Sequence, residues 1–272
     1  MKIGLVQMAV GVDKEENLRR ACGEVAAMAR CGAEMVVLPE MFLCPYDNKC
    51  FPEYGEEAGQ EAWLRMSDAA RENGVYLVGG SIPEKAEGKL YNTSFVFDPD
   101  GRQLGRHRKM HLFDIDVKGG QRFMESEVLT PGDEVTVVDT KWGKVGVCIC
   151  FDMRFPELAR LMTLKGARLL VVPAAFNMTT GPRHWELMFR QRAVDNQLFT
   201  VGVAPARDVS GGYVSYANSM VASPWGDVVY RAGAEPVSQV VELDLSLVDE
   251  VRKQLPLLSA RRVDVYRREN FL

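Results

Sequence analysis

The sequence has no run of apolar residues long enough to cross a membrane, although 47% of its 272 residues are hydrophobic. A membrane-spanning helix needs about 20 consecutive, mostly apolar residues. The first residues, MKIGLVQMAVGVDKEEN, are apolar only briefly and turn acidic where a signal peptide would have its small-residue cleavage site. We therefore interpret this stretch as a first core strand and expect a cytoplasmic protein.

The sequence also lacks a strong charge excess and a recognisable disulfide or metal-binding pattern. The formal net charge is −4, which gives no electrostatic reason to bind nucleic acid or an anionic membrane. The six cysteines form no C-x-x-C pair, and with the three histidines they do not reproduce the spacing of usual zinc sites. We expect reduced thiols and no structural metal.

No linker, low-complexity tract or charge block divides the chain, but its two halves follow the same order. The patterns of the first half predict strands at 1–8, 34–38 and 75–78, helices at 14–30 and 56–73, and a hairpin at 91–108. Those of the second half predict strands at 144–150, 167–172 and 198–203, helices at 156–165 and 182–196, and a hairpin at 217–231.

The predicted strands VVL and LLVV are continuously apolar, which is typical of sheets covered on both faces. Helices would cover one face of each sheet, and the other sheet would cover the second face. The pattern therefore predicts a single α/β domain, a four-layer α-β-β-α sandwich of two similar six-stranded sheets. We expect catalytic groups beyond the carboxyl ends of the strands.

Cys150 ends the run of strand formers KVGVCICF and directly precedes the turn DMRFP. A thiol at the end of a strand and the start of a helix lies near backbone N–H groups, which favour the thiolate. This position suits a nucleophile. The alternative is a buried cysteine that serves only as a small hydrophobic residue.

Three charged residues, Glu40, Lys109 and Glu125, are further candidates for catalysis. Glu40 closes the apolar run MVVLP, where desolvation would raise its pKa and suit it to act as a general base, although a salt bridge is equally consistent with its position. Lys109 lies where a basic stretch enters an apolar segment and could stabilise an oxyanion, although such stretches are usually solvated. Glu125 is a second acid. Because no histidine lies in a recognised Cys/His motif, a carboxylate would have to serve as the base.

The stretches VVLPE around Glu40, RHRKMHLFD around Lys109 and GVCICFDMRFPEL around Cys150 together resemble the nitrilase, or carbon-nitrogen hydrolase, superfamily. The resemblance covers nearly the whole chain. Further motifs, among them FPEY, GGSIPE, KLYNTS, AFNMTTGPRHWEL and RAVDNQ, are most similar to the omega-amidase branch, from which the loop KGGQR at 118–122 departs. The resemblance implies one carbon-nitrogen hydrolase domain over 1–272 that forms a homodimer or higher homo-oligomer. The basic carboxy-terminal extension, at about 256–272, is a candidate for packing on a partner subunit.

The resemblance also implies a mechanism without a cofactor. Glu40 would take the proton of Cys150, and the thiolate would attack the amide carbon to form a thioester. Lys109 and the backbone N–H of Phe151 would stabilise the oxyanion, and Glu125 would help to orient the groups.

Arg154 is the candidate for substrate recognition, because its planar guanidinium can bind a carboxylate through two hydrogen bonds. The alternative is a helix-end salt bridge. Thr179 and Thr180 either donate hydrogen bonds to the substrate or cap a helix. Further candidates for lining the pocket are Tyr46 and Phe176.

The predicted function is hydrolysis of the omega-amide of short 2-oxo dicarboxylates, namely 2-oxoglutaramate and 2-oxosuccinamate, to the 2-oxo acid and ammonia. The expected partner is thus a small-molecule amide, with no nucleic acid and no membrane. The alternatives are an N-carbamoyl amide hydrolase, a deaminated-glutathione amidase or a non-catalytic binding protein of this fold.

Overall fold

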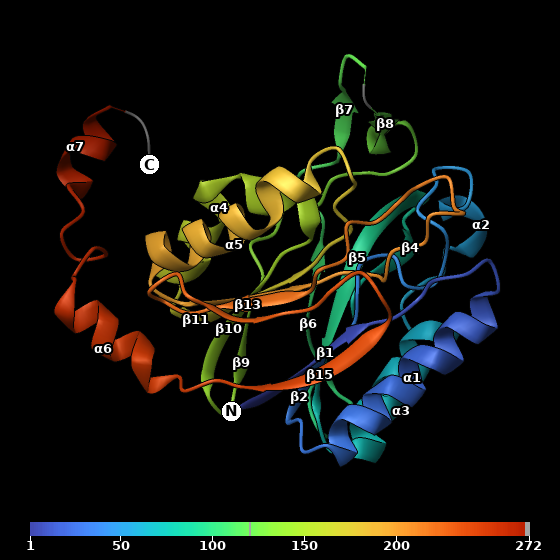
Figure 1. Cartoon of the computed structure of the whole chain (residues 1–272), viewed down its shortest axis with the longest axis horizontal. Helices are drawn as coiled ribbons and strands as arrows, with labels where there is room; N and C mark the ends of the chain where they lie inside the picture. Colours follow the sequence, from blue (N-terminus) through green and yellow to red (C-terminus); the bar gives the residue numbers. More distant parts are fainter. Residues whose placement is uncertain (120, 270–272) are drawn as a thin grey trace.

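Two β-sheets pack face to face at the centre of the structure, and helices cover the outer face of each sheet (Figure 1). The computed structural model describes residues 1–119 and 121–269. Its layers follow the order α-β-β-α, which confirms the fold class that the sequence predicts.

The first sheet has the strand order β15-β1-β2-β3-β5-β4, and β6 also pairs with β5. The strands are β1 (Lys2–Gln7), β2 (Met35–Val37), β3 (Tyr76–Val78), β4 (Ile82–Ala86), β5 (Lys89–Phe97), β6 (Gln103–Arg108) and β15 (Val237–Glu242). The covering helices are α1 (Lys14–Arg30) and α3 (Glu61–Asn73). Strands β1, β2 and β3 are parallel, as expected for strands joined by helices.

The second sheet repeats this arrangement in the order β14-β13-β12-β11-β10-β9. Its strands are β9 (Val137–Thr140), β10 (Gly143–Val147), β11 (Ala167–Pro173), β12 (Phe199–Val203), β13 (Met220–Ala222) and β14 (Val228–Arg231). The covering helices are α4 (Pro156–Leu164) and α5 (Gly181–Asn196). Strands β10, β11 and β12 are again parallel, so the repeat predicted from the sequence is present in the fold.

The apolar strands are buried on both faces, as their sequences indicate. In β2, Val36 packs with the helix-covered core, whereas Met35 and Val37 pack in the core between the sheets. In β11, Leu170 faces the helices and Val171 faces the other sheet. Alternate residues of a strand point to opposite faces, so a sheet between two layers needs apolar residues at every position.

Several details differ from the sequence prediction. The first sheet has seven strands rather than six, because the nine-residue β5 pairs with β3, β4 and β6. Strand β10 ends at Val147 rather than at Cys150. Cys150 has a φ of 46°, a left-handed conformation that cannot continue a strand, and it begins the short 3₁₀ helix η2 (Cys150–Arg154).

Helix α3 begins at Glu61, five residues after the predicted start at residue 56. The intervening carboxylate of Glu56 accepts the backbone N–H of Ala62 at 2.7 Å, which satisfies one of the free donors at the helix start. Short elements lie beyond the strand ends: α2 (Phe51–Tyr54), the two-stranded sheet of β7 (Asp114–Asp116) and β8 (Arg122–Met124), and the 3₁₀ helix η1 (Glu125–Glu127).

After β15 the chain forms α6 (Ser246–Gln254) and α7 (Val263–Arg268), which extend along one side of the sandwich (Figure 1). Residues 256–269 of the predicted extension are described, whereas 270–272 lie outside the described residues, as does Gly120 of the KGGQR loop. In the described part of the chain, no helix combines the length and the apolar character that a bilayer crossing requires.

Candidate active site

Four predicted site residues come together from both halves of the molecule. Glu40 lies three residues beyond the end of β2, and Lys109 directly follows β6. Glu125 begins η1, and Cys150 follows β10 of the second sheet. The site therefore lies where the two sheets meet, beyond their strand ends, as the sequence predicts.

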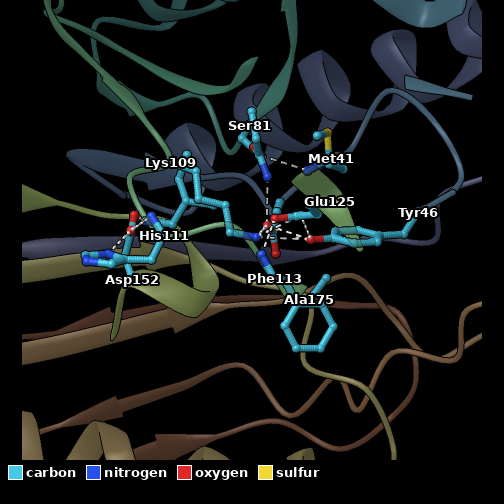
Figure 2. A network of polar contacts seen from close by, with 12 residues as sticks. Met41, Tyr46, Ser81, Lys109, His111, Phe113, Glu125, Asp152 and Ala175 are labelled. Atoms are coloured by element: carbon cyan, nitrogen blue, oxygen red, sulfur yellow. Dashed lines mark hydrogen bonds and ion pairs between the residues drawn. The ribbon is translucent and has the colours of Figure 1, made fainter. Parts of the chain in front are cut away.

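Lys109 is at the centre of this site (Figure 2). Its Nζ donates to Glu40 Oε1 at 3.0 Å, to Glu125 Oε1 at 2.9 Å and to the Tyr46 hydroxyl at 3.2 Å. The side chains of Lys109, Glu40 and Glu125 are all fully buried. Burial lowers the pKa of Lys109, but the charges of Glu125 and Glu40 outweigh it and raise that pKa above its ordinary value. Lys109 is therefore a cation held between two acids.

Glu40 uses its two oxygens differently. Oε1 accepts from Lys109 and Tyr46 and from Asn92 Nδ2 at 2.9 Å, whereas Oε2 is buried with no hydrogen-bond partner among the described residues. Burial raises the pKa of Glu40, the charge of Lys109 lowers it only in part, and the charge of Glu125 raises it further. A carboxylate with a raised pKa and a free oxygen can take up a proton.

Cys150 is 4% exposed and adopts its positive φ where η2 begins. A non-glycine residue in this region stores backbone strain, which often accompanies a functional position. Burial and the neighbouring Glu40 raise the pKa of the Cys150 thiol well above its usual range, and Lys109 opposes them only partly. The resting group is therefore a thiol, and not the thiolate that its position near backbone N–H groups predicts.

Glu125 is held from two sides. Its Oε1 accepts from Lys109, and its Oε2 accepts the backbone N–H of Phe113 at 2.7 Å. The Tyr46 hydroxyl donates to Glu125 Oε1 at 2.5 Å and also contacts Glu40 Oε1 at 3.1 Å. Tyr46, predicted as a residue that lines the pocket, thus connects the two carboxylates through its hydroxyl.

Arg154 forms no ion pair with a carboxylate in the described chain, so the alternative of a helix-end salt bridge is not realised. Its Nη1 lies 3.1 Å from His184 Nδ1, and its Nε is buried without a partner. The guanidinium lies over the rings of Phe176 and Phe151, at 4.9 Å and 5.4 Å from their centroids. Burial lowers the pKa of Arg154, while Cys150 and Tyr213 counteract it. The guanidinium of Arg154 thus keeps N–H donors that have no partner in the described chain.

Thr179 and Thr180 precede α5. Thr180 occupies the N-cap position, but its side chain makes no capping hydrogen bond. Its hydroxyl and its backbone N–H both donate to Asn177 Oδ1 at 3.0 Å. The carbonyl of Thr179 accepts from Arg183 at 3.4 Å. The side chain of Thr180 therefore does not cap α5 and is held by Asn177 instead.

A cleft of about 370 Å³ leads to this region, and its lining includes Glu40, Tyr46 and Tyr213. The rings of Tyr46 and Tyr213 stack with centroids 4.5 Å apart, and the Tyr213 hydroxyl donates to the carbonyl of Ala175. The sequence reasoning missed Asn92, Tyr213 and Asp152 as site residues. A signal was present for Asn92, a polar residue within the buried strand KLYNTS, and for Asp152, a charged residue directly after an apolar strand.

The described part of the chain contains no group of three or more His, Cys, Asp or Glu side chains placed to bind a metal ion. Its six cysteines are free thiols. The chemistry that the geometry supports is therefore that of a thiol, two carboxylates and two cations.

The family model for carbon-nitrogen hydrolases matches residues 2–253. The chain belongs to the carbon-nitrogen hydrolase family. Omega-amidase NIT2 of Xenopus tropicalis is 52% identical over 265 residues, which are 97% of this hydrolase and 96% of the relative. Nit3 of Saccharomyces cerevisiae, a member of branch 10 of the nitrilase superfamily, is 39% identical with a TM-score of 0.88 over 96% of each chain. The family and the fold predicted from the sequence are confirmed.

A third relative of this hydrolase has a modified active site. It is a glutamate-to-glutamine mutant of the amidase from Nesterenkonia sp. AN1, showing the result of Michael addition of acrylamide at the active site cysteine. That protein is 26% identical to this hydrolase, with a TM-score of 0.81 and complete coverage of both chains.

Proposed function

We propose that this carbon-nitrogen hydrolase is an omega-amidase that converts 2-oxoglutaramate and 2-oxosuccinamate to the 2-oxo dicarboxylates and ammonia. The observation that carries the proposal is the pairing of a buried Glu40–Lys109–Cys150 cluster with a guanidinium, Arg154, that has no carboxylate partner in the described chain. Its relatives named omega-amidase, identical at about half of the positions over nearly the whole chain, support the same activity.

In the first half-reaction Glu40 removes the proton from Cys150 as the sulfur attacks the amide carbon. A concerted transfer fits the raised pKa of the thiol, because no free thiolate has to form in advance, and the raised pKa of Glu40 makes its ionised carboxylate a stronger base. Lys109 and the backbone N–H of Phe151 stabilise the negative charge that develops on the amide oxygen. Protonated Glu40 then gives its proton to the nitrogen, the C–N bond breaks, and ammonia leaves.

In the second half-reaction a water molecule attacks the thioester carbon. Glu40 takes a proton from this water, the C–S bond breaks, and Cys150 regains its proton from Glu40 as the acid leaves. Glu125 keeps Lys109 in place through both steps, which its 2.9 Å contact with Nζ supports. No cofactor takes part.

Substrate selection in this proposal rests on Arg154 and Phe176. The guanidinium binds the carboxylate that lies away from the scissile amide, and the ring of Phe176 below it fixes its plane. Thr179, Thr180 and Tyr46 complete the wall of the pocket. The hydroxyl of Tyr46 is already bonded to the two acids, so only its ring is available to the substrate.

The test is product release from a panel of purified amides: ammonia from 2-oxoglutaramate, 2-oxosuccinamate and an N-carbamoyl amino acid, and cysteinylglycine from deaminated glutathione. We expect kcat/KM to be highest for the two omega-amides. The Arg154→Met variant should raise KM for these anions by about 10- to 100-fold, since a charged hydrogen bond contributes roughly 1.5–3 kcal/mol. Arg183→Met, which removes an exposed arginine near the same helix start, is the matched control.

The same panel separates the alternatives. Fastest turnover of the N-carbamoyl amino acid or of deaminated glutathione would assign the protein to another branch of the superfamily. A non-catalytic protein of this fold would hydrolyse none of the four compounds, and Cys150→Ala would then bind the amides as the wild type does.

The proposal retains one domain over 1–272, a cytoplasmic location and at least a homodimer in which the carboxy-terminal extension packs on the partner subunit. Its support is the exposed apolar surface beside this extension: Leu161 and Leu164 on α4 are 42% and 48% exposed, and none of the side chains of α7 is buried. Native mass spectrometry of the full chain and of a chain ending at Leu255 tests it, with a dimer expected only for the full chain.

A further inference from the structure

Asp152 lies in η2, two residues after Cys150, and its fully buried side chain contacts the segment that carries Lys109 (Figure 2). Its Oδ1 accepts the backbone N–H groups of Met110 at 3.1 Å and of His111 at 2.9 Å, and it lies 2.8 Å from His111 Nδ1. These contacts hold the two residues that directly follow Lys109.

The second oxygen of Asp152 contacts both segments. Its Oδ2 lies 2.8 Å from His107 Nε2, and it accepts the backbone N–H of Ile149 at 3.0 Å. His107 precedes Lys109 by two residues, and Ile149 directly precedes Cys150. Every contact of this carboxylate therefore goes to a residue within two positions of Lys109 or Cys150.

These segments belong to different layers of the fold. Lys109 follows β6 of the first sheet, whereas Cys150 follows β10 of the second. The hydrogen bond from Ile149 also closes the tight turn in which Cys150 takes its positive φ. One side chain thus sets the conformation of the cysteine and connects it to the strand that presents the lysine.

The charge state of Asp152 fits this role. Burial opposes ionisation, but hydrogen bonds from His107 and His111 outweigh it and hold the pKa of Asp152 well below its usual value. An ionised carboxylate only accepts hydrogen bonds, and all of its contacts are with nitrogen atoms that can donate.

We propose that Asp152 is a positioning residue of the reaction, which keeps Lys109 and Cys150 at the separation that catalysis requires. The inference rests on the proposed function, in which these two residues stabilise the oxyanion and attack the amide carbon. Misplacement of a catalytic group by about 1 Å can cost about 100-fold in rate.

Asp152→Asn is the decisive variant, because it keeps the size of the side chain and removes one acceptor. Backbone N–H groups face both oxygens, from Met110 and His111 on one side and from Ile149 on the other. Whichever way the amide is turned, its NH₂ group meets a backbone N–H. The variant therefore cannot reproduce the bridge between the segments.

We expect kcat of Asp152→Asn to fall by about 100-fold while KM changes by less than about threefold. The substrate cation Arg154 is anchored separately, because Arg192 donates to the carbonyls of Met153 and Arg154 at 2.9 and 3.0 Å. A residue that only supported the stability of the fold would lower the folded fraction and leave kcat per folded enzyme unchanged. The rates are therefore measured well below the melting temperature and divided by the folded fraction.

Gln7→Ala is the matched control. Gln7 is also buried and also connects the two halves, since it bonds to the carbonyls of Gly233 and Glu235 and to the backbone and hydroxyl of Ser219. None of these partners is in the site. We expect Gln7→Ala to lower the melting temperature and to leave kcat unchanged.

A second measurement does not depend on the substrate. Amide hydrogen exchange of peptides that contain 109–111 and 148–150 should accelerate in both segments of Asp152→Asn and in neither segment of Gln7→Ala. The kcat values of all variants are measured with whichever amide the wild type hydrolyses fastest. If that amide is not an omega-amide, the proposed omega-amidase activity is contradicted, but the positioning role of Asp152 is still tested. Unchanged kcat in Asp152→Asn, or exchange that accelerates in only one segment, would overturn the positioning role.

Discussion

Lys109 Nζ lies 3.0 Å from Glu40 Oε1, and neither side chain is exposed to solvent. Charges interact strongly at this distance when water is excluded, so the ammonium favours the ionised carboxylate. The pKa of Glu40 is nevertheless raised, because burial outweighs this attraction and Glu125 adds repulsion. Glu40 is therefore paired with a cation and can still accept a proton during the reaction.

Replacing Glu40 by glutamine should stop turnover without removing the nucleophile. We expect Glu40→Gln to lower kcat by about 1,000-fold, within the range that a general base contributes. Cys150 should still react with acrylamide, detected as a mass increase on its peptide. Glu127→Gln changes an exposed acid and serves as the control. Turnover at the wild-type rate in Glu40→Gln would remove Glu40 from the mechanism.

The pH dependence of the wild type should report the raised pKa of Glu40. The carboxylate must be ionised to act as a base, so kcat/KM should fall as the pH decreases through a value above the ordinary 4.5. The charged or titratable groups that face Glu40 are Lys109, Glu125, Tyr46 and Cys150. Because Glu125 raises this pKa, Glu125→Gln should move the acid limb to lower pH. A limb that stays in place in this variant would show that another group titrates.

The same shift predicts that Glu40 costs stability. A carboxyl group whose pKa is higher in the folded than in the unfolded state destabilises the fold when it ionises, and this loss develops as the pH rises from 4.5 through the folded pKa. Glutamine does not ionise. We expect Glu40→Gln to unfold at a higher urea concentration than the wild type at pH 8 and at a similar concentration at pH 4. A lower midpoint for the variant at pH 8 contradicts the sign of the shift.

Tyr46→Phe tests whether the hydroxyl serves the catalytic groups or the substrate. The hydroxyl contacts both acids and Lys109, and removal of a donor to a buried carboxylate costs about 1–3 kcal/mol. We expect kcat to fall by about 10- to 100-fold and KM to change little. Tyr76→Phe, which removes a hydroxyl that contacts the backbone of Lys141, is the control. A rise in KM at unchanged kcat would instead indicate a contact with the substrate.

The sequence predicts the parts of the site that depend on strand ends and not those that depend on how the sheets meet. Glu40 and Cys150 each lie just beyond an apolar strand, and Lys109 directly follows the basic strand β6, so their convergence follows from the layered fold. The contact of Tyr46 with Glu125 joins residues 79 positions apart, and that of Asp152 with His107 joins residues 45 positions apart. Such contacts require the packing of two sheets, for which the local pattern carries no signal.

The thiol at position 150 shows a second limit of the sequence. The backbone N–H groups near a helix start favour a thiolate, and this expectation considers only the local chain. In the folded protein, desolvation and the charge of Glu40 act in the opposite direction and dominate. A pKa depends on all groups that folding brings near. The position of Cys150 along the chain therefore could not predict the direction of its pKa shift.

Gly80 supports the backbone that carries Glu40. It has a φ of 55°, and a Cβ at this position would lie 2.1 Å from the carbonyl oxygen of Pro39. The next residue, Ser81, donates its N–H to that carbonyl at 3.2 Å and accepts the backbone N–H of Met41 at 3.0 Å (Figure 2). Gly80 and Ser81 therefore fix the residues on both sides of Glu40.

Gly80→Ala should displace Glu40 and lower kcat by about 10- to 100-fold, because the clash can be relieved only by moving the backbone at Pro39. Gly88→Ala is the matched control, since Gly88 has a φ of 73° but no atom within 4 Å of an added Cβ. Both variants pay the cost of a left-handed residue, about 1–2 kcal/mol. Urea unfolding should show this loss in both, and a further loss in Gly80→Ala. If the two variants lost the same stability and both kept the wild-type kcat, the backbone at Pro39 would not control the position of Glu40.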